Sequence, residues 1–106
     1  MGRASIADTH GWILVLNGNV EEGIDVLHSA TSAEYEDRAP AEAFYHLGEA
    51  YLKKSNTEQA LVNFELALKK FDDSVKKGVF VDPDLKNKAT DAIARAKSKT
   101  AAALNP

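Results

Sequence analysis

YHLGEAYLKKSNTEQALVNFELAL, residues Tyr45–Leu68, consists of two helix-like runs joined by only three residues, Lys54–Asn56. Asn56 is a good N-cap for the second run, and Gln59 three residues later can bond back to the amide of the cap, as in a capping box. A joint this short keeps the two helices side by side. The stretch therefore predicts an antiparallel pair of helices.

The same pattern occurs 37 residues earlier, where the segment Gly11–Ala30 aligns with Gly48–Ala67 without a gap. The matched positions are Gly11 with Gly48, Leu14 with Tyr51, Asn19 with Asn56, Glu22 with Gln59, Gly23 with Ala60, Leu27 with Phe64 and Ala30 with Ala67. The small residues allow two helix axes to approach and cross, and the large ones fill the space around the crossing. We therefore predict two copies of one folding unit.

Helical spacing and capping signals predict five helices in one domain over residues 1–106. The expected helices are Ser5–Asn17, Val20–Thr31, Pro40–Lys54, one from Thr57 to the C-cap Gly78, and a capping helix over about residues 82–101. In the last, Asp82 and Pro83 are the expected N-cap and first-turn proline. The predicted fold class is all-α, with helical hairpins over about residues 4–37 and 38–78 and a C-terminal capping helix.

Two shorter segments carry weaker signals. Val79–Val81 is apolar, but no other segment could pair with it as a strand, so we expect a linker packed against the second hairpin. The chain from Thr100 onward ends in small residues and is expected to fray.

Composition excludes several classes of protein. A chain of 106 residues with 44% hydrophobic content suffices for one packed core, and the lack of cysteine excludes disulfide and thiolate chemistry. The longest apolar run, Trp12–Leu16, is far shorter than the ~20 residues of a membrane span. We therefore expect no membrane insertion.

The charge is uneven along the chain, because residues 1–50 contain two basic and nine acidic side chains. Proteins that bind nucleic acid carry basic stripes, so no nucleic-acid partner is expected. A groove with this acidic charge would favour a basic or neutral partner. The alternative is an ordinary solubilising surface.

The second unit resembles the tetratricopeptide repeat family, whose motif residues fall on Phe44, Leu47, Gly48, Tyr51, Ala60 and Phe64. The first unit matches less well, and His10 replaces a leucine that the family buries, so His10 is expected in or at the core. The resemblance covers roughly residues 4–100 and implies an α-solenoid. Asp8–Trp12 also resembles repeats in bacterial arrays of envelope and polysaccharide-export systems. The compartment, cytoplasm or envelope, stays open.

In that family the first helix of each hairpin lines a concave face that binds protein partners. Carried over by position, the resemblance implies a binding face of Asp8, Thr9, Trp12, Glu42, Tyr45, His46, Glu49 and Lys53. Trp12 and Tyr45 are the candidates for the strongest contacts, because an aromatic side chain in a groove offers a large contact area. The alternative for Trp12 is packing against a neighbouring helix only. The expected function is a protein-interaction module that binds a peptide or helix of a partner.

The sequence contains little that would indicate metal binding, phosphate binding or catalysis. Glu42, His46 and Glu49 share a helical face, but three ligands at loose spacing without a second histidine make a poor metal site. There is no glycine-rich phosphate loop and no nucleophile elbow. The family's chaperone-tail clamp is not expected, because none of Asp8, Trp12 and His46 at the corresponding positions can repeat the charge-assisted contact of a lysine. We predict a protein that is not an enzyme and has no cofactor.

Ile6 and Ile13 lie on the outer side of the first predicted helix. Stacks usually need about three repeats to bury a continuous core, and only two are recognised here. The alternative function is therefore a structural or self-association element. In it, Ile6 and Ile13 would be covered by a second copy of the chain or by further repeats of a longer array.

Overall fold

The computed structural model describes residues 3–32 and 40–104 of the chain. These residues form α-helices and no strand, which confirms the all-α class. The helices are α1 (Arg3–Leu16), α2 (Val20–Ala30), α3 (Ala41–Lys53), α4 (Thr57–Lys77) and α5 (Leu85–Leu104). Their bounds agree with the sequence-based expectation to within three residues. Within the described segments, no helix is long and apolar enough to cross a bilayer.

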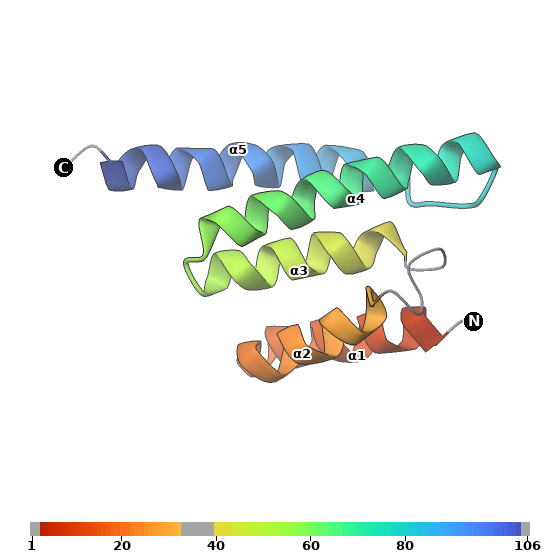
Figure 1. Cartoon of the computed structure of the whole chain (residues 1–106), viewed down its shortest axis with the longest axis horizontal. Helices are drawn as coiled ribbons and strands as arrows, with labels where there is room; N and C mark the ends of the chain where they lie inside the picture. The colour runs from red at the N-terminus through yellow and green to blue at the C-terminus, as the bar shows by residue number, and fades with distance from the viewer. Residues whose placement is uncertain (1–2, 33–39, 105–106) are drawn as a thin grey trace.

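α1 and α2 lie together at one end of the molecule, and α3, α4 and α5 follow in chain order (Figure 1). α1 and α2 pack against each other, and so do α3 and α4. α3 also contacts both helices of the first pair, while α5 lies along α4 and touches α3. As a result, α3 is the helix that joins the first pair to the rest of the molecule.

Glycine residues allow both pairs to cross closely, as predicted. A Cβ atom on Gly23 would lie 2.8 Å from the carbonyl oxygen of Gly11, and one on Gly11 would lie 2.7 Å from Cγ of Leu27. A Cβ atom on Gly48 would meet the ring of Phe64. There is no room for a side chain at these positions, because atoms of the facing helix already occupy the space beside each glycine.

The buried side chains form two main clusters, and each joins more than one pair of helices. The first consists of Val15, Ile24, Leu27, Leu47 and Ala50, from α1, α2 and α3. The second consists of Leu52, Ala60, Phe64, Ala92 and Ala96, from α3, α4 and α5. Because α3 contributes to both clusters, the core is shared along the stack.

The turns inside the two pairs have the same backbone hydrogen bond. The amide of Asn19 donates to the carbonyl of Leu14, and the amide of Asn56 donates to the carbonyl of Tyr51, both at 2.9 Å. The residues just before the two asparagines, Gly18 (φ 92°) and Ser55 (φ 62°), both have positive φ. Ser55 therefore holds a conformation that ordinarily favours glycine.

Of the two predicted side-chain caps, the one at Asn56 is correct and the one at Asn19 is wrong. The Asn56 side-chain oxygen accepts a hydrogen bond from the amide of Gln59 at 3.2 Å, as expected. Asn19 makes no side-chain cap hydrogen bond, so the capping box predicted for α2 is wrong. The acidic residues Glu21 and Glu22 in the first turn complement the positive end of the helix dipole there instead.

The predictions around α5 need three corrections. α5 begins at Leu85 rather than at Pro83, although the Asp82 carboxylate accepts from the Asp84 amide at 3.0 Å, which is the bond expected of the predicted N-cap. α5 stays helical to Leu104 rather than fraying from Thr100, whose hydroxyl donates to the carbonyl of Ala96 at 3.2 Å. The connection before α5 is not packed on the second pair, because Phe80 is 88% exposed.

His10 was expected in or at the core, and this prediction is wrong because His10 is exposed. The equivalent position in α3, Leu47, is buried by the first helix pair, but within the described residues no helix precedes α1 to cover His10.

Candidate interaction face

Three of the predicted site residues form a contact between α1 and α3. The Nδ1 atom of His46 on α3 lies 2.7 Å from Oδ1 of Asp8 on α1. The ring of Trp12 stacks on the same imidazole, with the centroids 4.4 Å apart and the planes at 15°. The alternative interpretation of Trp12, packing against a neighbouring helix, therefore describes part of its surroundings, although the side chain is still partly exposed.

A second contact joins α3 to α5. An Nη2 atom of Arg95 on α5 donates to Oε1 of Glu49 on α3 at 3.1 Å. The hydroxyl of Tyr45 donates to the other carboxylate oxygen at 3.5 Å, and the Tyr45 ring lies tilted against Phe64 with the centroids 5.9 Å apart. Arg95 was not among the predicted site residues, because the sequence alone does not indicate which side chain of α5 lies opposite α3.

Side chains of α1, α3 and α5 thus meet on one side of the molecule, which we call the α1–α3–α5 face. Its residues are Asp8, Trp12, Tyr45, His46, Glu49, Lys53, Arg95 and Lys99. Of the other predicted residues, Thr9 is exposed on α1 and Glu42 is partly buried in the first turn of α3. Ile6 and Ile13 are exposed on α1.

The charge of this face differs from the expected acidic groove. A hollow of about 160 Å³ between α3 and α5 is lined by Glu49, Leu52, Lys53, Arg95 and Lys99. The carboxylate of Glu49 is already paired with Arg95, whereas Lys53 and Lys99 are exposed. The α3–α5 end of the face is therefore basic, although residues 1–50 are acidic as a whole.

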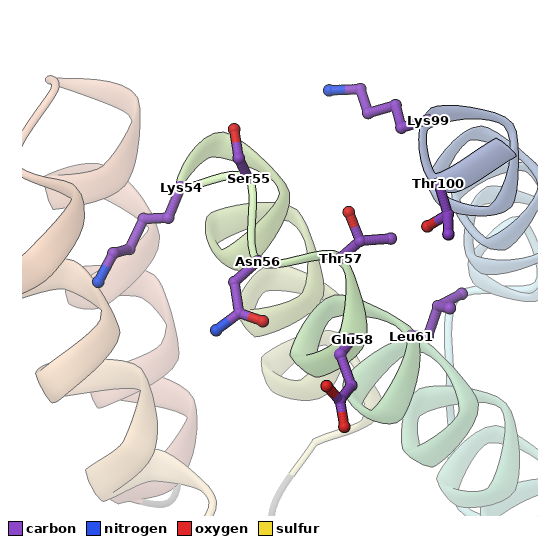
Figure 2. Close-up of a pocket in the computed structure, with 8 residues that line it drawn as sticks. All are labelled: Lys54, Ser55, Asn56, Thr57, Glu58, Leu61, Lys99 and Thr100. Carbon is purple, nitrogen blue, oxygen red and sulfur yellow. The ribbon is translucent and has the colours of Figure 1, made fainter. Parts of the chain in front are cut away.

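A larger hollow of about 650 Å³ lies where the α3–α4 turn approaches the C-terminal part of α5 (Figure 2). Thr57, Leu61 and Thr100 point toward one another across the gap between α4 and α5. Lys54 points away toward the first helix pair, where it forms an ion pair with Glu21. This hollow could not be predicted from the sequence, because its walls come from segments about 40 residues apart.

The two hollows share one residue, Lys99, which lines both. The smaller hollow is mainly polar and basic, while the larger one has the apolar side chain of Leu61 and the methyl groups of two threonines in its wall. Together they provide adjacent places for a charged and an apolar group.

The pKa of Tyr45 provides a test of the α3–α5 contact. Burial raises the pKa of the phenol above its ordinary value of 10.0, the Glu49 carboxylate raises it further, and the Arg95 guanidinium partly offsets this. We expect Glu49→Gln to lower the pKa of Tyr45 and Arg95→Gln to raise it. The measurement is an absorbance titration of tyrosinate, with Tyr45→Phe identifying the signal. Shifts of the same sign in both variants would contradict this geometry.

The same shift makes the stability depend on pH at the alkaline end. The pKa of Tyr45 is higher in the folded chain than in the unfolded chain. The contribution of Tyr45 to the free energy of unfolding is therefore fully present below pH 10 and is lost as the pH rises through the folded-state pKa.

Within residues 3–32 and 40–104, no three histidine, cysteine, aspartate or glutamate side chains are grouped so that they could hold a metal ion. Comparison of the chain with protein-family models, with curated proteins and with solved structures finds no match.

Proposed function

We propose that this chain is a protein-interaction module of the tetratricopeptide repeat type. In this proposal it is an α-solenoid of two helical hairpins and a capping helix, with no catalytic activity and no cofactor. It binds an extended or helical segment of a partner protein on the α1–α3–α5 face. The observation that carries the proposal is the pair of contacts Asp8–His46 and Glu49–Arg95, which join α1, α3 and α5 side by side.

The internal similarity of the two helix pairs supports the repeat interpretation. The turn residues Gly18 and Ser55 are 37 positions apart, which is the offset of the sequence match, and both have positive φ. The glycines Gly11 and Gly48 occupy close crossings in the first and second pair, at the same offset. Similar backbone conformation at equivalent positions is what two copies of one folding unit require.

The two hollows favour a partner segment with an acidic residue next to an apolar one. Lys53 and Lys99 are unlike Arg95 in that no ion pair to a carboxylate is found for them among the described residues. Lysine ammonium groups attract carboxylates as compact point charges. The adjoining Leu61 can contact an apolar side chain. This replaces the expectation of a basic partner, which rested on the total charge of residues 1–50.

Peptide selection tests the proposal. A randomised peptide library displayed on phage is selected against the folded chain, and binding of the selected peptides is followed through the fluorescence of Trp12, the single tryptophan. We expect enrichment of peptides with Asp or Glu. We also expect the double variant Lys53→Glu/Lys99→Glu to weaken their binding by about tenfold, since two attractive charges become repulsive.

Lys69→Glu/Lys97→Glu is the matched control, because it makes the same charge change at exposed positions outside the α1–α3–α5 face. It should leave the affinity within about twofold of the original. A selection that enriches no peptide, or binding that falls equally in both double variants, would contradict the proposal.

A further inference from the structure

α3 presents four polar side chains in a row beside the α1–α3–α5 face. Glu42, His46, Glu49 and Lys53 follow one another at intervals of three or four residues, so they lie along one side of the helix. Each of the four is partly or fully exposed, whereas most other residues of α3 are buried. We call these four residues the α3 row. A partner segment that runs along α3 meets their side chains in this order.

The charge changes sign along the α3 row. Glu42 lies in the first turn of α3, and no ion pair is found for it in the part of the chain that the structure describes. Glu49 is paired with Arg95, so it adds little net charge. Lys53 at the other end lines the smaller hollow together with Lys99. The row is therefore acidic where α3 begins and basic where it ends.

Aromatic rings lie next to the acidic end of the row. Trp12 stacks on the imidazole of His46, one helical turn after Glu42, and the centroid of the Tyr45 ring is 5.7 Å from that of the same imidazole. All three rings are partly exposed. A planar guanidinium group can stack on an aromatic ring and also donate two parallel hydrogen bonds to a carboxylate, which an ammonium group cannot. The acidic end therefore suits arginine better than lysine.

We propose that the partner segment binds with an arginine at Glu42 and the aromatic rings and with its acidic residue at Lys53 and Lys99. This inference rests on the proposed function, since it states how the segment lies on that face. Lys53 follows His46 by seven residues and Glu42 by eleven, or roughly 10–17 Å along the helix axis. An extended chain covers this distance in about three to five residues. The arginine and the acidic residue are thus about three to five positions apart in the partner.

Synthetic peptides of one composition test the spacing. Each contains one arginine and one glutamate, a leucine beside the glutamate, and glycine and serine elsewhere, and the arginine and glutamate are one to five positions apart. Binding is followed through the fluorescence of Trp12. We expect the affinity to be highest at three to five positions. It should be about threefold lower at one position, where only one of the two charges can be paired.

Substitution of Glu42 tests where the arginine binds. Glu42→Lys should lower the affinity for the best arginine peptide about fivefold, and Glu42→Gln, which removes the charge with little change of shape, about threefold. Neither should weaken the binding of the same peptide with glutamine in place of arginine. With glutamate in place of arginine, the peptide should bind Glu42→Lys more tightly than the original chain.

Glu65→Lys on α4 is the matched control, because it makes the same change of charge at an exposed position outside the face. It should leave the affinity for the arginine peptide within about twofold of the original. Circular dichroism checks that each variant is folded.

The outcomes separate this inference from the proposed function. If Lys53→Glu/Lys99→Glu weakens binding but Glu42→Lys weakens the arginine and glutamine peptides equally, the face binds a segment in another arrangement and this inference is wrong. Equal affinity at one position and at four, or equal weakening by Glu42→Lys and Glu65→Lys, would also overturn it. If none of the synthetic peptides binds, the inference is wrong, and the selection from the randomised library decides the proposed function separately.

Discussion

Phe64→Ala is expected to lower the free energy of unfolding by about 3–5 kcal/mol. Phe64 on α4 is among the largest fully buried side chains of the described structure. Its ring packs in the cluster with Leu52, Ala92 and Ala96 and lies against the backbone of Gly48. Ala92, Ala96 and Gly48 beside it are too small to extend into the space that the lost ring leaves, so a cavity remains there and adds to the loss of stability.

The loss caused by Phe64→Ala would be a large part of the whole free energy of unfolding, because domains of this size are stable by about 5–15 kcal/mol. Urea denaturation followed by circular dichroism measures it. Phe80→Ala is the matched control, since it removes the same ring from a position that is 88% exposed. It should change the free energy of unfolding by less than about 0.5 kcal/mol. Similar losses in both variants would mean that Phe64 is not the centre of the α3–α4–α5 core.

Gly23→Ala should destabilise the protein even though alanine favours helix formation. In an exposed helix the change from glycine would add up to about 1 kcal/mol of stability. Here the new Cβ would lie 2.8 Å from the carbonyl oxygen of Gly11 and too close to the Val15 side chain, so α1 and α2 must move apart. Such overpacking costs about 1–3 kcal/mol, which outweighs the gain.

The prediction is tested by whether Gly23→Ala lowers or raises the free energy of unfolding, which urea denaturation again measures. Ser29→Ala on the exposed side of α2 is the control, because it improves helix propensity without a clash. It should be neutral or slightly stabilising. An increase in stability for Gly23→Ala would contradict the close approach of α1 and α2.

Much of the fold could be predicted from the sequence because its signals act over short distances along the chain. The spacing of apolar residues and the cap at Asn56 depend on residues three or four positions apart, and all five helices were found to within three residues. The glycine crossing at Gly11 and Gly23 was also predictable, since the pattern recurs at Gly48. Local signals failed at Asn19, where the side chain does not cap, and at Phe80, which was expected to pack on the second helix pair but is exposed.

The candidate face was predicted only in part. The sequence placed Asp8, Trp12 and His46 on leading helices and allowed Asp8 to come near His46, but it did not indicate that the Trp12 ring stacks on the same imidazole. It gave no reason to pair Glu49 with Arg95, 46 residues later, or to place Lys99 beside both hollows. Those contacts depend on the angle and offset at which whole helices pack.

The sequence by itself therefore determined an all-α chain with a 37-residue internal repeat. The spacing of apolar residues, the helix caps and the small residues at helix crossings can each be recognised from residues that lie close together in the chain. Only the tertiary structure decided which charges are neutralised and which stay exposed. An acidic stretch of sequence can contribute to a basic surface when its carboxylates, such as that of Glu49, are paired by a helix that comes much later in the chain.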